Sequence, residues 1–302
     1  MKLLQILILV SVVNADQFFN NFTICGKPIK KRTMESSNYV SPGYFPWQAA
    51  VKKTVISNFN GLPDCGATLI SNEWLVSAAH CNITVGDHVV LGANYIGLSV
   101  EESRQYFRVK FVRPHPSYSK VTNDYDIALV QLDKPATYTD YVRPACIINS
   151  GTKLAAATKS EVSGWGLLKC GGPENLQKGE ISISSNDVCN QIYGNKEVTP
   201  RMLCAKHPAG GREGCLGDGG GPLVVDVKQN QQFYLAGVVS WGTKCRHGFP
   251  EVFANVSTLR EWLQEELKSK KVYRRLKVVK YHYTATIIQS YMIISTPQTG
   301  SN

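Results

Sequence analysis

Short apolar runs, separated by turn-forming residues, dominate most of the chain. Typical runs are Asp126–Leu132, Tyr234–Val239 and Val252–Val256, which are five to seven residues long, and Gly, Pro, Asn and Asp recur between such runs. Many short strands with frequent turn signals are typical of an all-β sandwich or barrel. The sequence shows no internal repeat of fixed period. The pattern therefore predicts an all-β fold.

One amphipathic helix is predicted near residue 260. Apolar residues recur there on one helical face: Leu259, Trp262, Leu263 and Leu267. Thr258 and Glu261 have the spacing of a capping box, which predicts that the helix starts at Thr258. We expect the folded domain to end with this helix, and residues 268–302 to form a flexible extension.

The first fifteen residues have the order of features found in a secretory signal peptide. Lys2 supplies the charge, residues 3–13 are nearly all apolar, and Val13-Asn14-Ala15 is a small-residue cleavage site. The apolar run is too short to span a membrane. We therefore expect residues 1–15 to be removed from a secreted, extracellular protein, and residues 16–32 to form a propeptide-like segment.

Cysteines and glycosylation motifs agree with secretion. The chain has nine cysteines, and disulfides persist in oxidising compartments. An odd number leaves at least one thiol free or paired between chains. Three Asn-X-Ser/Thr motifs begin at Asn21, Asn82 and Asn255, which predicts a glycoprotein.

The positive charge of the chain is concentrated in its last part. The formal net charge is +10, and no acidic residue follows Glu266. Without seven basic residues of the extension, 26 basic and 23 acidic residues remain, a difference of three. Residues 268–280 could therefore bind sulfated glycans or anionic surfaces, or they are simply a solvated tail. These seven are Lys268, Lys270, Lys271, Arg274, Arg275, Lys277 and Lys280.

Three segments carry residues that are typical of acyl-transfer chemistry. They read Trp74-Leu-Val-Ser-Ala-Ala-His80-Cys81, then Asp126-Ile-Ala-Leu-Val, then Gly-Cys-Leu-Gly-Asp-Gly-Gly-Gly-Pro-Leu over residues 214–223. Their order resembles the trypsin and chymotrypsin-like serine proteases over about residues 33–267. The resemblance implies two packed antiparallel β-barrels with the active site between them, followed by the C-terminal α-helix.

The resemblance also assigns roles to these residues. In the family a serine hydroxyl attacks the carbonyl, an imidazole takes its proton, and a buried carboxylate orients the imidazole. His80 matches the base and Asp126 the orienting acid, with Asp124 as the competing acid. The nucleophile is missing, because the family's Gly-Asp-Ser-Gly-Gly-Pro has glycine at position 219 here. The backbone N–H groups of Gly217 and Gly219 correspond to the oxyanion hole.

The family's activation start and specificity pocket also differ here. An Ile-Val-Gly-Gly-like start would fall near residues 34–37, which read Met-Glu-Ser-Ser, and cleavage after Arg32 would expose Thr33. Asp218 would then lack its usual ammonium partner. The pocket would be formed by Glu213, Ser240, Gly242 and Glu251. Two glutamates in one pocket would repel each other, so one would stay protonated. Such a pocket is filled or accepts a basic side chain weakly, unless Glu251 turns to solvent.

The resemblance implies the cysteine pairing by position. The implied disulfides are Cys25–Cys146, Cys65–Cys81, Cys189–Cys204 and Cys215–Cys245. Cys170 is left unpaired, either as a free thiol or as a link between chains.

The sequence therefore predicts a non-catalytic protease homologue, whose partners are proteases, inhibitors or substrates in extracellular proteolysis, immunity or venom. Two alternatives stay open: an active serine endopeptidase with basic-residue preference, and a polyanion-binding protein acting through its tail. The sequence has no metal or cofactor motif, and we expect no cofactor, nucleic-acid partner or transmembrane span.

Overall fold

The structure is a computed structural model of the 302-residue chain. It describes residues 24–28, 40–54, 63–97, 101–166, 175–194, 197–207, 219–227, 230–242 and 249–269. The predicted signal peptide and the extension from residue 270 onward lie outside these ranges. The chain divides into two compact units, Met1–Arg260 and Glu261–Asn302, and all the strands named below belong to the first.

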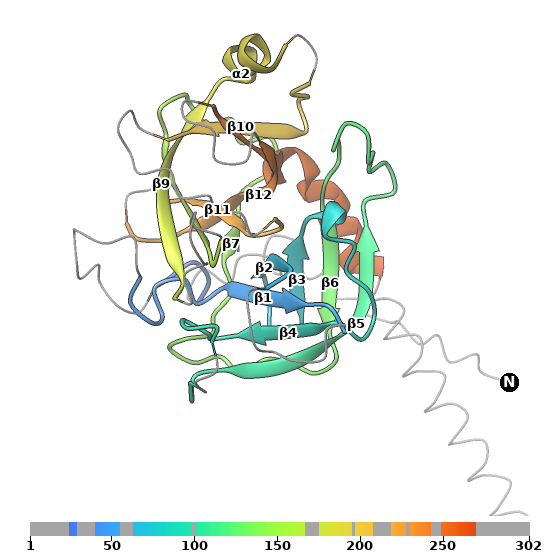
Figure 1. The fold of residues 1–302 in the computed structure, drawn as a ribbon, viewed down its shortest axis with the longest axis vertical. Helices are drawn as coiled ribbons and strands as arrows, with labels where there is room; N and C mark the ends of the chain where they lie inside the picture. Colours follow the sequence, from blue (N-terminus) through green and yellow to red (C-terminus); the bar gives the residue numbers. More distant parts are fainter. Residues whose placement is uncertain are drawn as a thin grey trace, which may run out of the picture. The chain divides into compact units, whose positions relative to one another are not determined.

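Six antiparallel strands form a closed barrel in the first half of the chain (Figure 1). The order around it is β1-β2-β3-β6-β5-β4, and β1 closes the barrel by pairing with both β2 and β4. The strands are β1 (Gln48–Lys52), β2 (Cys65–Leu69), β3 (Trp74–Ser77), β4 (His88–Leu91), β5 (Gln105–Pro114) and β6 (Ala128–Leu132).

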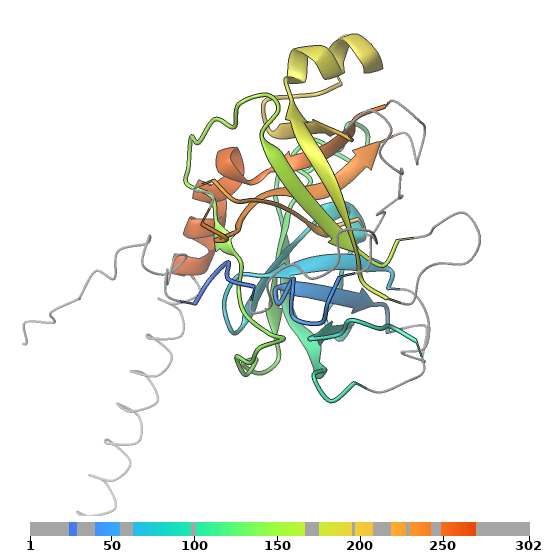
Figure 2. The same cartoon turned by 90° about the vertical axis from the view of Figure 1, so that its left-hand side faces the viewer.

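A second group of strands follows the order β11-β8-β9-β10-β13-β12, and the pairing of β11 with β12 closes it as well (Figure 2). The strands are β7 (Cys146–Ile147), β8 (Lys159–Gly164), β9 (Gln177–Ser184), β10 (Met202–Lys206), β11 (Pro222–Val225), β12 (Tyr234–Gly242) and β13 (Glu251–Asn255). Only β7, among the described strands, is added in parallel, beside β12. The prediction of two antiparallel β-barrels is confirmed.

Burial explains why the strands read as apolar runs rather than as alternating patterns. Every residue of β1, β2, β3 and β6 is buried. Strand β5, which pairs with both β4 and β6, alternates instead between buried Phe107 and Val109 and the exposed residues beside them. A strand covered on both faces shows a continuous apolar run, and a strand with one wet face alternates.

The predicted C-terminal helix is confirmed over residues 256–269, but its predicted start is wrong. Asn255 ends β13, and its side-chain Oδ1 accepts a hydrogen bond from the N–H of Ser257 at 3.1 Å, which makes Asn255 the N-cap. Thr258 lies inside the first turn, where its hydroxyl donates to the carbonyl of Asn255 at 3.0 Å. The strand therefore passes directly into the helix, three residues before the predicted cap.

Three of the four expected disulfides are present, namely Cys25–Cys146, Cys65–Cys81 and Cys189–Cys204. The fourth expected pair, Cys215–Cys245, and the leftover Cys170 lie outside the described residues. The first bridge spans 121 residues, so the segment around Cys25 is covalently joined to β7.

An ionic clamp joins the two barrels next to Asp126. The carboxylate of Asp124 accepts hydrogen bonds from Thr199 Oγ1 at 2.8 Å and from Arg201 Nε at 3.2 Å. The Arg201 guanidinium also lies over the ring of Tyr125, 5.0 Å from its centroid. Burial raises the pKa of Asp124, but the hydrogen bonds from Arg201 and Thr199 and the charge of Arg201 outweigh it, so the net pKa is lowered.

The clamp predicts a pH-dependent loss of stability on Asp124→Asn. At neutral pH the variant should lose about 1.5–3 kcal/mol of unfolding free energy, because hydrogen bonds to a charged group are lost. The pKa of Asp124 is depressed in the folded state, so its stabilisation is complete above the unfolded pKa of about 3.9 and fades as the pH falls through the folded pKa. Urea unfolding at neutral and acidic pH measures the gap between the two proteins, which should narrow in acid.

Asp140→Asn is the matched control, because Asp140 is 66% exposed in its ion pair with Arg143. An exposed pair contributes about 1 kcal/mol at most, so this variant should change little at either pH. A gap of equal size at neutral and acidic pH for Asp124→Asn would show that the clamp is not ionic.

Candidate active site

His80 lies on a short 3₁₀ turn at the end of strand β3. The turn, Ala79–Cys81, follows extended Ala78 and ends at Asn82, which has the left-handed conformation with φ of 47°. The Cys65–Cys81 disulfide fixes the residue after His80 to strand β2. The backbone around the imidazole is therefore held on both sides.

Asp126 orients His80 through two hydrogen bonds. Its Oδ1 accepts from the backbone N–H of His80 at 2.8 Å, and its Oδ2 lies 2.6 Å from Nδ1 of the imidazole. Ser240 donates a third hydrogen bond to Oδ2 at 2.5 Å. Asp126 is only 1% exposed. A carboxylate at Nδ1 favours the tautomer with its proton there, which leaves the lone pair on Nε2.

Gly219 faces this Nε2. A Cβ placed on Gly219 would lie 2.3 Å from Nε2 and 2.9 Å from Cε1 of His80. These distances are shorter than van der Waals contact, so the imidazole stands in the space that a side chain at position 219 would need. The structure thus brings together the three residues that the sequence singled out, and the third offers no functional group.

The backbone of the glycine turn is anchored to both barrels. Gly219 accepts a hydrogen bond at its carbonyl from Gly66 of β2 at 2.9 Å, and Gly220 donates to the carbonyl of Val239 in β12 at 2.8 Å. Gly220 has φ of +84°, and a Cβ there would lie 2.3 Å from Ser77 Oγ. Only glycine fits this conformation without strain. These hydrogen bonds therefore hold the backbone of the turn in the position that places residue 219 next to His80.

The expected specificity pocket is described only in part. Gly242 of β12 pairs with Glu251 of β13, and Ser240 lies two residues before Gly242. Glu251 is 29% exposed, and its carboxylate lies 3.4 Å from Nε2 of His207. Sequence reasoning missed His207, because this residue reaches Glu251 only through the pairing of β10 with β13. Glu213 and Gly217 lie outside the described residues.

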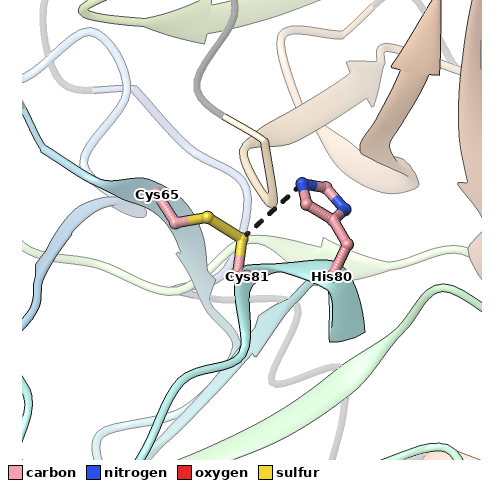
Figure 3. A group of neighbouring side chains, drawn as sticks. All are labelled: Cys65, His80 and Cys81. Carbon is pink, nitrogen blue, oxygen red and sulfur yellow. Dashed lines mark hydrogen bonds between the residues drawn. A yellow bond between two sulfur atoms is a disulfide. The ribbon is translucent and has the colours of Figure 1, made fainter. Parts of the chain in front are cut away.

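The Cys65, Cys81 and His80 side chains form a cluster that resembles a metal site in its geometry (Figure 3). Their ligand atoms all lie within 4.8 Å of one another. The two sulfurs are joined in the disulfide, however, so neither is a thiolate, which is the form of cysteine that binds metals. The disulfide instead packs against the site, with Cys81 Sγ 3.2 Å from the carbonyl of Gly219.

Two of the three glycosylation motifs lie within the described residues. Asn82 is exposed at the end of the 3₁₀ turn. Asn255 is half-buried, and its side-chain carbonyl caps the helix. Asn21 lies outside the described range.

The site therefore has the parts of a general base, and of the described residues next to Nε2 the one at position 219 carries no side chain. An imidazole oriented by a buried carboxylate can accept a proton at Nε2. The group that would give up this proton in a serine protease is the hydroxyl of the residue that is Gly219 here.

Comparison with known proteins agrees with the fold and the geometry. The chain matches the profile of the family described as Trypsin over residues 36–263. It is 38% identical over 236 residues to transmembrane protease serine 9 of Rattus norvegicus, covering 76% of this chain and 22% of that protein. It is 34% identical over 265 residues to transmembrane protease serine 11E of Mus musculus, covering 84% of this chain and 60% of that protein. A human relative, the atrial natriuretic peptide-converting enzyme, is 34% identical over 236 residues, covering 75% of this chain and 22% of that enzyme.

The chain thus spans between about a fifth and three fifths of the length of these relatives. Across the residues that the structure describes, no helix combines the length and apolar character needed to cross a bilayer. The profile match covers most of the chain, and the two closed barrels agree with it. The chain belongs to the trypsin family of serine proteases.

Proposed function

We propose that this protein is a secreted, non-catalytic trypsin homologue that acts by binding proteases, inhibitors or substrates in extracellular proteolysis, immunity or venom. The observation that carries the proposal is glycine at position 219, directly opposite Nε2 of His80. Glycine has no group that His80 could deprotonate. The rest of the scaffold is retained, which favours a role that uses its surface rather than its chemistry.

The geometry of the site supports a loss that goes beyond one hydroxyl. A serine at position 219 would need a hydrogen bond of about 2.6–3.2 Å to Nε2. The place of its Cβ is only 2.3 Å from Nε2, so the imidazole would first have to move. The imidazole of His80 thus occupies the space that a serine side chain at position 219 would need, as expected where no nucleophile has to be accommodated.

The pairing of Glu251 supports a changed specificity pocket. The sequence predicts that Glu251 and Glu213 lie in the same specificity pocket. In the structure, Glu251 has His207 as a partner at 3.4 Å. A carboxylate that already faces an imidazole attracts a basic side chain less than a lone carboxylate would. This pairing disfavours the strong binding of Lys or Arg side chains that cleavage after basic residues would need.

The alternative function is an active serine endopeptidase. The names of the relatives favour it, since they are proteases. It requires another nucleophile, however, and Ser240 donates its hydroxyl to Asp126 rather than to Nε2 of His80. A second alternative, polyanion binding by residues 268–280, rests on residues that lie outside the described range from 270 onward.

The proposal predicts no turnover of peptide substrates with Lys, Arg or an aromatic residue before the scissile bond. Without a nucleophile, oxyanion contacts and binding retain only about 10³–10⁴-fold acceleration over water. Chromogenic peptide hydrolysis by the purified protein measures this, with trypsin as positive control. The variant His80→Ala separates the outcomes. Turnover that persists in this variant comes from a contaminant, whereas turnover that disappears with His80 would contradict the proposal.

Gly219→Ser is predicted to restore only weak activity. The imidazole has to move to admit the side chain, and misplacement of a catalytic group can cost about 10²-fold in rate. The chain also lacks the family's activation start, so the oxyanion donors should stay misaligned, and each lost contact costs about 10²–10³-fold. The variant is treated with trypsin to cut after Arg32 and assayed on basic and aromatic substrates.

Gly219→Ala is the matched control, because it imposes the same Cβ on His80 without supplying a hydroxyl. It should show no turnover and the same change in stability as Gly219→Ser. Trypsin-like rates for Gly219→Ser alone would show that only one residue separates this chain from an enzyme. Improvement by Glu251→Gly and an Ile-Val-Gly-Gly start would show drift at several sites.

A further inference from the structure

Strand β5 carries a row of basic side chains on the solvent-exposed face of the first barrel. Arg108, Lys110 and Arg113 are all exposed. We call these three residues the basic strip. The strand that carries them, Gln105–Pro114, contains no acidic residue. At about 3.3 Å per residue, the strip extends over roughly 16 Å.

Two further basic residues lie beside the strip on the neighbouring strands β4 and β1. Arg108 lies directly opposite His88 of β4, and His88 lies opposite Lys52 of β1. Directly opposite residues in adjacent strands point to the same face, and like charges there repel. Burial lowers the pKa of His88, and the charge of Arg108 lowers it further, while Asp87 raises it. The net pKa of His88 is therefore lowered, mainly by burial and further by the charge of Arg108.

Nearby residues modify this charge without cancelling it. Lys134 follows β6, and its ammonium lies 5.6 Å from the ring centroid of Phe107 on β5. Asp133 accepts a hydrogen bond from the backbone N–H of Arg108 at 3.1 Å. Among the described residues, the basic groups on this part of the barrel are Arg108, Lys110, Arg113 and Lys134, and Asp133 and Asp87 are acidic neighbours.

The side chains of the strip determine which kind of partner can use it. β5 pairs with β4 over Gln105–Arg108 and with β6 over Val109–Pro114. The exposed basic groups of the strip belong to its side chains. Arg and Lys side chains bind sulfate-like groups through charge-assisted hydrogen bonds, and a linear polyanion can follow a straight row of them.

We propose that the basic strip of β5 is a binding site for a sulfated polysaccharide. The site is distinct from the candidate active site and from the C-terminal extension. It does not depend on whether the protein is catalytic. The polysaccharide supplies sulfates to Arg108, Lys110 and Arg113 in turn, and its negative charge reduces the repulsion among these three basic side chains.

The test uses the full chain and charge variants of it, with heparin oligosaccharide as the probe. The variant Arg108→Gln/Lys110→Gln/Arg113→Gln should bind at least about 10-fold more weakly at low ionic strength, and its affinity should depend less steeply on salt. The matched control Lys153→Gln/Lys159→Gln/Lys206→Gln removes the same charge from three exposed positions of the second barrel. Its affinity should change by less than about 3-fold, because it keeps the local contacts and alters only screened, distant charge.

A second readout reports on the site itself. A bound anion favours the protonated imidazole, so heparin should raise the pKa of His88 in an NMR titration of the full chain. Lys52 and Arg108 lie opposite His88 on the adjacent strands, and Asp87 precedes it in the chain. If heparin no longer raises the pKa of His88 in the strip variant but still raises it in the control, the result supports the basic strip as the binding site.

Three results would overturn the proposal. The first is equal weakening of both triple variants, which would mean that only net charge matters. The second is an unchanged affinity of the strip variant, which would assign heparin to the extension. The third is equally tight binding of a poly-glutamate peptide of matched charge, which would assign the strip to an acidic protein partner.

Discussion

The buried carboxylate of Asp126 is the interaction on which the candidate active site depends. It accepts hydrogen bonds from the backbone and the imidazole of His80 and from the hydroxyl of Ser240. These donors come from both barrels, because His80 follows β3 and Ser240 lies in β12. A buried carboxylate is stable only when it is well hydrogen-bonded. The same bonds therefore hold the imidazole in place and join the two halves of the fold.

Hydrogen bonds and a disulfide anchor the backbone around position 219, where this chain has glycine. The turn of Gly219 and Gly220 keeps its hydrogen bonds to Gly66 and Val239, and the Cys65–Cys81 disulfide packs against it. The imidazole occupies the space of the missing side chain. In the non-catalytic role that we propose, the fold provides surfaces for binding, including the basic strip on β5.

The sequence predicted the barrels, the helix and three of the disulfides, because each leaves a local pattern or a motif with a fixed family position. It did not predict contacts that depend on strand register. Asn255 caps the helix because β13 runs straight into it, whereas the sequence favoured Thr258. His207 meets Glu251 only because β10 and β13 pair. Asp124 accepts a hydrogen bond from Arg201, which is 77 residues away in the chain, and no local sequence pattern indicates this contact.

Covalent labelling tests the central claim most directly, because it asks whether any side chain next to His80 acts as a nucleophile. The purified protein is incubated with a serine-directed fluorophosphonate, and its intact mass is measured beside that of trypsin and of His80→Ala. Our account predicts that trypsin gains one adduct while this protein keeps its unmodified mass. A stoichiometric adduct that disappears in His80→Ala would contradict it, since a working nucleophile would then lie within reach of the imidazole.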